Sequence, residues 1–383
     1  MDCSNSQKHP CLKKKIEPVI KMKIAILGGG MVGSLIATEL SEKYQIDVYD
    51  KAHLELKDVK TITFDVNDKD FLHKLKNYNL VLNCLPGFMG YNMLKKIIEL
   101  NLSCVDISFM PENCLDLSKE KSQIKGTIIP DAGVAPGLSN LIVGNLVANN
   151  NIEEIQIMVG GLPKVKNPPW NYRAPFSPID VIEEYTRPAR AKIDNKIITK
   201  KALSDIINFE FEGIGELEAF LTDGLRTILD SDPEISKIPN LLEYTIRYPG
   251  HAKLVEKLID EGAFSDEIIE IQGKKITRKE NTCLDLFRQW KLTDEEEFTL
   301  MIIIARTIEG KEISYTVYDE RKGGWSSMSR TTGLTACAFA ELLIRGDIKQ
   351  EGIICPEIIG KSDDYYNFVI DYLNERGIEI KSH

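Results

Sequence analysis

The stretch KIAILGGGMVGSLIATEL, from Lys23 to Leu40, joins a short apolar run to a helical pattern through three spaced glycines. This is G-x-G-x-x-G between a predicted strand and a predicted helix. Gly28 permits the tight turn, Gly30 lets a pyrophosphate approach the backbone, and Gly33 lets the helix pack closely on the strand. The helix N-terminus adds free N–H groups that favour phosphate. We therefore expect a dinucleotide site with contacts from Gly28, Gly30, Met31, Val32 and Gly33.

The second predicted strand, QIDVYD at residues 45–50, ends in Asp50, at the spacing where an acid binds an adenosine ribose. A carboxylate accepts hydrogen bonds from the ribose 2′-OH and repels a 2′-phosphate, which favours NAD over NADP. The alternative is a solvated aspartate at a strand end, and the cation of Lys51 beside it weakens the argument for NAD.

Four further predicted strands follow, at residues 59–66, 79–87, 102–109 and 126–133, with helices at 68–78 and 89–101. Strands that alternate with helices indicate parallel βαβ units with helices on both faces, a doubly wound α/β domain of the Rossmann type. Ligands bind such sheets beyond the carboxyl ends of the strands. We expect cofactor contacts there from Asp65, Cys84, Leu85, Pro86 and Asp106. No activating base lies near Cys84 in the sequence, which favours a lining residue over a nucleophile.

From about Asn151 the pattern changes to a second α/β unit. Predicted strands at 152–163, 208–215, 297–310 and 311–320 favour a mixed, largely antiparallel sheet, with helices at 216–231 and 250–262. The apolar helix at 331–346 is predicted to return to the first domain. The expected organisation is a polar leader (1–21), an NAD-binding Rossmann domain (22–142), a substrate and oligomerisation domain (143–330), and C-terminal helices that return to the first domain (331–383).

Composition excludes several classes of protein. The net charge is −10 without a basic stripe, which argues against nucleic-acid binding. The eight cysteines include no C-x-x-C pair and the five histidines form no metal motif, so we expect reduced thiols, a cytoplasmic protein and no metal. No apolar segment is long enough to span a bilayer, so no membrane association is expected. The leader has no apolar core of the secretory type, and either precedes a natural start at Met22 or is native.

Several motifs together resemble the saccharopine dehydrogenase family. They are the glycine turn, DAGVAPGLSN (131–140), SPIDVIEEYTRPARA (177–191), LTDGLRTIL (221–229), IRYPGH (246–251) and SRTTGLTACAFAELL (329–343), which occur in that order from about Lys23 to Gly360. The resemblance implies a Rossmann domain, a mixed α/β substrate domain, a nicotinamide cofactor and an amino-acid substrate. It also implies a homodimer or a larger homo-oligomer.

Within the family the sequence looks most similar to the lysine 6-dehydrogenases, which oxidise the ε-amine carbon of lysine to a semialdehyde that cyclises to a piperideine carboxylate. Saccharopine reductases characteristically carry Asp-Pro-Gly where this chain has Ala135, Pro136 and Gly137. That departure favours a substrate smaller than saccharopine. Saccharopine dehydrogenase and a polyamine-pathway dehydrogenase stay open as alternatives, and so does a non-catalytic protein that binds NAD(H).

Oxidation of an amine by hydride transfer requires a neutral amine and a substrate that is held still. Asp131 is a candidate to hold the ammonium or to orient water, and His251 is a candidate base. Arg247 is a candidate for the substrate carboxylate, because a guanidinium binds both oxygens. Tyr172 and Arg173 lie in a loop of the kind that closes over substrates. Arg330 and Thr331 begin the returning helix, where N–H groups meet anions.

Each of these residues also has a structural alternative. Asp131 caps a turn, His251 is a partly exposed histidine at a helix start, and Arg247 forms a surface ion pair. Arg330 and Thr331 belong to a simple helix cap. Asp223 and Arg226 are predicted to form a structural i,i+3 salt bridge on a helix.

Overall fold

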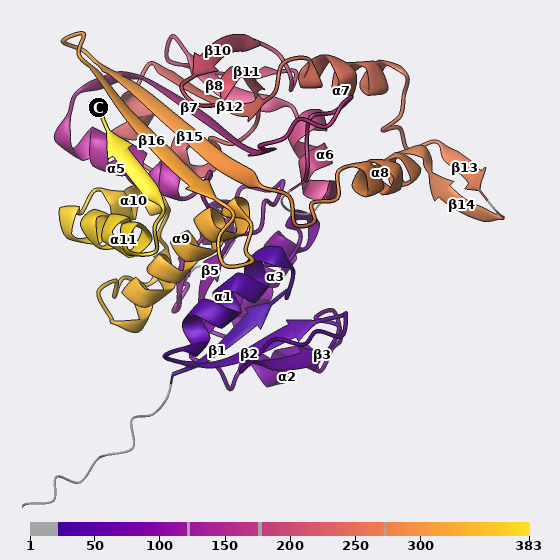
Figure 1. The fold of residues 1–383 in the computed structure, drawn as a ribbon. Coiled ribbons are helices and arrows are strands. Elements are labelled where there is room, and N and C mark those ends of the chain that lie inside the picture. Colours follow the sequence, from indigo (N-terminus) through magenta and orange to yellow (C-terminus); the bar gives the residue numbers. More distant parts are fainter. Residues whose placement is uncertain (1–21, 121–122, 175–177, 272) are drawn as a thin grey trace, which may run out of the picture.

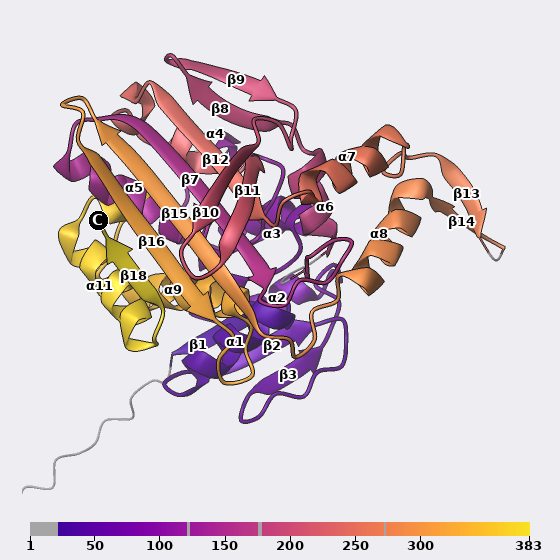
Figure 2. The same cartoon turned by 45° about the horizontal axis from the view of Figure 1, so that its top comes forward.

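The computed structural model describes residues 22–383 except 121–122, 175–177 and 272. The predicted polar leader at residues 1–21 lies outside the described residues. The chain forms two large sheets, one at each end of the molecule, with helices against them (Figure 1). The β13–β14 hairpin (Ile268–Ile271 and Lys274–Thr277) and α8 (Arg278–Gln289) project to one side (Figures 1 and 2).

The first sheet is parallel throughout and has seven strands in the order β17-β6-β5-β4-β1-β2-β3. The predicted doubly wound Rossmann-type fold is therefore confirmed. The strands are β1 (Lys23–Leu27), β2 (Gln45–Asp50), β3 (Lys60–Thr63), β4 (Leu80–Asn83), β5 (Ser103–Asp106), β6 (Thr127–Ile129) and β17 (Gly352–Ile353). Strand β17 was not predicted from the sequence, because two residues are too few to give a periodic pattern.

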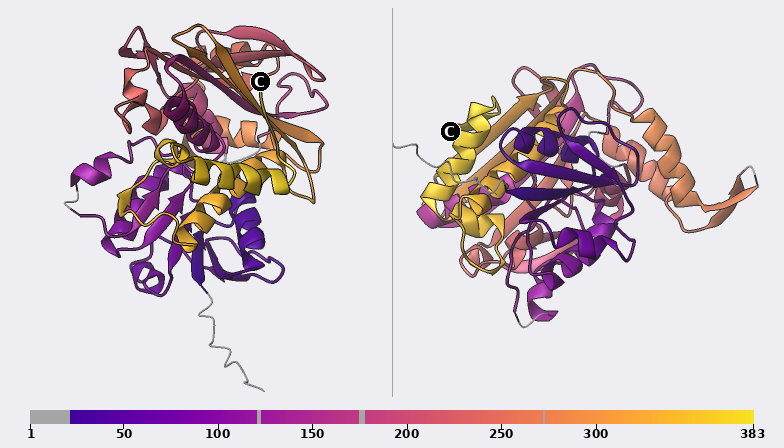
Figure 3. Two further views of the ribbon diagram at one scale, coloured as in Figure 1. Left: turned by 90° about the vertical axis from the view of Figure 1, so that its left-hand side faces the viewer. Right: turned by 90° about the horizontal axis from the view of Figure 1, so that it is seen from below.

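Helices cover both faces of this sheet because its strands are apolar on both sides; residues 24–27 of β1 are fully buried. One face packs against α2 (Phe71–Leu75), α3 (Gly87–Glu99) and α4 (Asp116–Glu120). The other packs against α1 (Met31–Ser41), α5 (Leu138–Asn149) and α9 (Ser327–Ile344). The long helix α9 lies directly along α1, so a late segment of the chain completes the first core (Figure 3). The short helices α10 (Pro356–Gly360) and α11 (Asp363–Glu375) pack on α5 and α9.

The second sheet is mixed, as predicted: β7 and β12 pair in parallel, and the other strand pairs among the described residues are antiparallel. Its strands follow the order β10-β11-β12-β7-β15-β16-β18. Off this path, β8 pairs with β12, and β9 pairs with β8. Its strands are β7 (Ile152–Pro163), β8 (Ala189–Ile193), β9 (Lys196–Lys200), β10 (Ile207–Phe211), β11 (Gly215–Leu221), β12 (Asn240–Arg247), β15 (Glu297–Thr307), β16 (Glu312–Glu320) and β18 (Glu379–Ser382). The helices α6 (Pro178–Thr186) and α7 (His251–Asp260) flank the β10 side of this sheet (Figure 2).

The helix predicted at residues 216–231 is wrong. Its first part is strand β11, which pairs with both β10 and β12, and its last part contains the short 3₁₀ turn η1 (Arg226–Leu229). A second 3₁₀ turn, η2 (Ile235–Lys237), follows beyond the predicted helix. Arg226 has φ +52°, a left-handed conformation that interrupts a helix. Tertiary pairing therefore overrode the helical pattern of apolar residues.

Candidate active site

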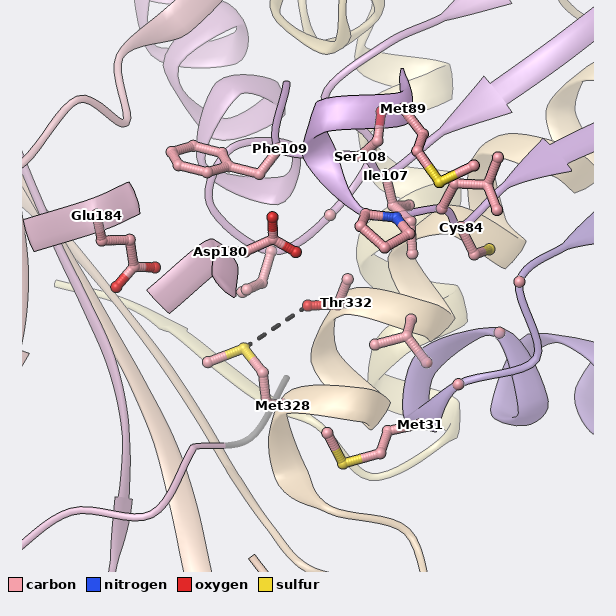
Figure 4. Close-up of a pocket in the computed structure, with 18 of the residues that line it drawn as sticks. Met31, Cys84, Met89, Ile107, Ser108, Phe109, Asp180, Glu184, Met328 and Thr332 are labelled. Carbon is pink, nitrogen blue, oxygen red and sulfur yellow. Dashed lines mark hydrogen bonds between the residues drawn. The ribbon is translucent and has the colours of Figure 1, made fainter. Parts of the chain in front are cut away.

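A cavity of about 700 Å³ lies between the carboxyl ends of the first sheet and the second sheet. Its walls come from the glycine turn, from the segments after β4, β5 and β6, and from α6, β7, β12 and α9. Figure 4 shows Asp180 and Glu184 of α6 facing the same space as Met328 and Thr332 of α9 and the Cys84 segment. The two units thus contribute opposite walls of one site.

The glycine turn at one end of the cavity packs closely at Gly28 and Gly33 and is open at Gly30. Gly28 has φ +94°, and a Cβ there would lie 2.6 Å from the carbonyl oxygen of Cys84. A Cβ on Gly33 would lie 2.0 Å from the carbonyl oxygen of Gly28. A Cβ built on Gly30 would meet no atom within 4 Å from the other described residues beyond its chain neighbours, so this side of the turn is open. That geometry fits the pyrophosphate of a dinucleotide, whose nicotinamide would supply the redox chemistry of the site.

Asp50 lies beside the turn at the end of β2 and lines the cavity. Its carboxylate accepts hydrogen bonds of 2.8 Å from the backbone N–H groups of Gly29 and Ala52. The side chain is therefore held against the turn and offers its remaining acceptor capacity to a ligand.

Ten of the eleven predicted cofactor residues line the cavity: Gly28, Gly30, Met31, Val32, Gly33, Asp50, Asp65, Cys84, Leu85 and Pro86. Asp106 does not line it, and its carboxylate accepts hydrogen bonds from Asn83 Nδ2 and from the backbone and hydroxyl of Ser108. Burial raises the pKa of Asp106 to about 7. Asp106 is thus an internal support for the loop after β5, which corrects the predicted cofactor contact. Burial also raises the pKa of the Cys84 thiol, which opposes a nucleophilic role.

Strand β12 supplies the far wall through alternate residues. Glu243, Thr245 and Arg247 all line the cavity, because side chains two apart on a strand share one face. Glu243 Oε2 accepts hydrogen bonds from Thr222 Oγ1 (2.7 Å) and from the Gly224 N–H (2.9 Å). Burial raises the pKa of this carboxyl to about 8.

Arg247 is a buried cation that reaches the cavity wall. Its Nε donates to Tyr185 Oη (2.9 Å), and its Nη2 donates to Tyr172 Oη (3.4 Å) and to Glu184 Oε2 (3.2 Å). The guanidinium also lies 4.4 Å from the centre of the Tyr172 ring. Tyr172 lines the cavity as well, so the two predicted substrate contacts are neighbours; their role in binding stays a prediction.

His251 lies behind this wall and does not line the cavity. Its Nδ1 is 3.0 Å from the carbonyl oxygen of Trp170 and therefore carries the hydrogen, which leaves Nε2 to accept from Tyr185 Oη at 3.0 Å. Burial and the cation of Arg247 lower the pKa of His251 to about 3. The predicted base is thus a neutral imidazole that orients Tyr185 and, through it, Arg247. Trp170 packs against the imidazole ring of His251.

Asp131 lines the cavity, and its Oδ1 lies 3.4 Å from Arg226 Nε. Its Oδ2 is buried and has no hydrogen-bond partner among the described residues. This ion pair corrects the predicted bridge between Asp223 and Arg226, because Asp223 instead binds Arg190 at 2.8 Å. The two ion pairs connect distant segments, which spacing along the chain does not reveal. The predicted catalytic role of Asp131 is untested by the fold.

Three predicted substrate contacts lie away from the cavity. Arg173 pairs with Glu295 (3.0 Å), and Arg330 pairs with Asp319 (2.7 Å). The Thr331 hydroxyl donates to the backbone oxygen of Ser327. These residues hold structural segments together, which corrects their assignment to the substrate. The next residue of α9, Thr332, lines the cavity instead.

Three acidic residues of the wall were not predicted from the sequence: Asp180, Glu184 and Glu243. Glu243 shares a face of β12 with the predicted contact Arg247, but no strand was predicted at residues 240–247, so this relation became visible only in the fold. Asp180 and Glu184 are four residues apart on α6 and share a helical face, but only the fold shows which face meets the cavity.

The described part of the chain contains no group of histidine, cysteine and acidic side chains placed to hold a metal ion. Nor does it contain a helix long and apolar enough to cross a membrane.

A parallel sheet with a glycine turn, closed at its ligand edge by a second mixed sheet, defines a two-unit protein of the Rossmann dinucleotide-binding class. Residues 24–129 match the family model described as the saccharopine dehydrogenase NADP binding domain, and residues 133–378 match the saccharopine dehydrogenase C-terminal domain. The chain therefore belongs to the saccharopine dehydrogenase family, which confirms the resemblance seen in the sequence.

Curated relatives are distant. The mitochondrial alpha-aminoadipic semialdehyde synthase of Rattus norvegicus is 21% identical, over 94% of this chain and 47% of the rat protein. Saccharopine dehydrogenase [NADP(+), L-glutamate-forming] of Saccharomyces cerevisiae is 23% identical, over 73% of this chain and 66% of the yeast protein. The chain thus spans about half the length of the rat relative.

Among solved structures, the apo L-Glu-forming saccharopine dehydrogenase of Saccharomyces cerevisiae superposes with a TM-score of 0.72 at 17% identity. The match covers 94% of this chain and all of the yeast chain, and it supports the fold alone. The matching family model and the yeast relative both carry NADP in their names, so these names do not support the expected preference for NAD.

Proposed function

We propose that the protein oxidises the ε-amine carbon of L-lysine by hydride transfer to NAD. The resulting semialdehyde would cyclise to a piperideine-6-carboxylate. The observation that carries this proposal is the charge of the substrate half of the cavity.

Four carboxyl groups line that half, from Asp131, Asp180, Glu184 and Glu243. Two guanidinium groups oppose them: Arg247, which also lines the cavity, and Arg226, which pairs with Asp131. Such a wall favours a ligand with more positive than negative groups. Lysine has two ammonium groups and one carboxylate, whereas saccharopine has two amines and three carboxylates. The wall therefore favours lysine.

Arg247 argues for an amino acid rather than a simple polyamine. A guanidinium facing the cavity is suited to one carboxylate, and a polyamine has none. Ala135 also lines the cavity and offers no polar side-chain group to the second amino-acid moiety of saccharopine. Both residues support lysine over the alternatives from the same family.

Asp50 supports NAD. Its carboxylate is fixed at the turn by Gly29 and Ala52, where a 2′-phosphate would meet a negative charge. The neighbouring Lys51 also lines the cavity and is the one feature there that favours NADP.

The test is NADH or NADPH formation at alkaline pH with L-lysine, saccharopine, cadaverine and spermidine, each with NAD and with NADP. We expect the highest kcat/KM for L-lysine with NAD. Faster turnover of saccharopine would refute the lysine assignment. Tight nucleotide binding without turnover of any amine would favour a non-catalytic NAD(H)-binding protein.

A further inference from the structure

Glu184 occupies a distinctive place in the cavity wall. It lies on α6, one turn after Asp180, and Figure 4 shows both carboxyl groups directed toward the space between the two units. Its only described hydrogen-bond partner is Arg247, at 3.2 Å, and its side chain is 19% exposed. It is therefore both within the site and open to proton exchange.

The other acidic groups of the wall are less exposed than Glu184. Glu243 is 3% exposed, accepts from Thr222 and Gly224, and packs so closely that a Cβ on Gly224 would lie 2.4 Å from its Cδ. Asp131 is 2% exposed and paired with Arg226. Asp180 Oδ1 accepts from the Gly87 N–H at the start of α3.

Charged and titratable groups face Glu184 from each neighbouring element: Arg247 and Glu243 from β12, Tyr172 from the loop before α6, Asp180 and Tyr185 from α6 itself, and Arg187 directly after its end. Burial raises the pKa of Glu184 to about 7, while Arg247 opposes that rise. A carboxyl group in this range is ionised in alkaline solution and still able to take up a proton.

We propose that Glu184 is the general base that removes a proton from the substrate ammonium before hydride transfer. The inference rests on the proposed function, the oxidation of a primary amine in this cavity. One N–H bond of the ammonium breaks and its electron pair stays on nitrogen, while the proton forms an O–H bond with the Glu184 carboxylate. The neutral amine then has the lone pair needed to expel hydride to the nicotinamide, and the solvent-exposed part of Glu184 returns the proton to water.

The test variant is Glu184→Gln, whose amide oxygen still accepts from Arg247. Its kcat/KM for L-lysine at pH 7.5 is expected to fall about 10²- to 10³-fold. The loss should shrink as the pH approaches about 10.4, where the ε-amine deprotonates without help from the enzyme. Glu184→Asp keeps a carboxylate and should keep the pH profile of the wild type at a lower rate.

Glu183→Gln is the matched control. Glu183 is the neighbouring residue on α6, pairs with Lys279 at 3.0 Å and does not line the cavity. It should leave both the rate and the pH profile unchanged. Nucleotide binding and the midpoint of thermal unfolding establish that each variant is folded.

An active wild type combined with a Glu184→Gln loss that is equal at every pH would overturn the base assignment and leave the proposed function intact. An unchanged rate would do the same. A wild type that oxidises no amine would overturn both. If another amine is the substrate, the same pH series with that amine tests Glu184.

Discussion

Replacing Glu243 by glutamine should stabilise the protein in alkaline solution. The carboxyl is buried beside Glu184 and Asp223, and its pKa rises from 4.5 to about 8 chiefly through loss of hydration. Glutamine has nearly the same size, and its amide oxygen still accepts from Thr222 and Gly224. The substitution therefore removes the charge with little change in packing.

The sign follows from the pKa in the two states. The folded protein prefers the protonated carboxyl of Glu243. The contribution of this preference to the free energy of unfolding is complete below pH 4.5 and is lost as the pH rises toward 8. The interval from 4.5 to about 8 corresponds to about 5 kcal/mol, which is an upper limit. Relative to wild type, Glu243→Gln should gain several kcal/mol in free energy of unfolding between pH 5 and pH 8.5.

Urea unfolding of both proteins at pH 5 and pH 8.5 measures this gain. The variant should be close to wild type at pH 5 and clearly more stable at pH 8.5. Addition of L-lysine at pH 8.5 should stabilise wild type more than the variant, because the ammonium compensates the buried charge. A stability difference that is the same at both pH values would show that the charge of Glu243 does not destabilise the folded protein.

Three further predictions concern the cofactor turn and the support of Arg247. The Cβ of Gly33→Ala would lie 2.0 Å from the Gly28 oxygen, so this variant should have a lower unfolding midpoint and bind nucleotide at least tenfold more weakly. Gly30→Ala should weaken nucleotide binding without lowering the unfolding midpoint. Calorimetric titration with NADH measures the binding, and thermal unfolding distinguishes the two variants. Asp50→Ala should lower kcat/KM for NAD about tenfold with little change for NADP, and equal losses in steady-state assays would contradict its ribose contact. His251→Leu leaves the Tyr185 hydroxyl without its acceptor and should raise KM for lysine but not for NAD, while His251→Gln should retain more activity. If kcat/KM of the wild type changes with pH around 6.5 and this change is absent from His251→Gln, the assignment of a neutral imidazole to His251 is wrong.

The fold of the first unit was readable because its signals are local. The glycine turn, the apolar strands and the acid at the end of β2 each occur within a few consecutive residues, where backbone geometry dictates the residue type. Local signals were misleading at residues 216–231, where pairing of β11 with β10 and β12 decided the conformation. Strand β17 was not predicted, because it forms where a late segment of the chain pairs with β6.

Local patterns along the chain were enough to predict a parallel sheet with a dinucleotide turn, a second mixed sheet, and the edge at which a ligand is expected. Which charged side chains meet at that edge became clear only from the fold. The fold placed Glu184 and Glu243 in the wall, placed His251 behind it, and paired Asp131 with Arg226. A strand or turn depends on neighbours along the chain. The charge of a cavity depends on side chains from distant segments that burial brings together.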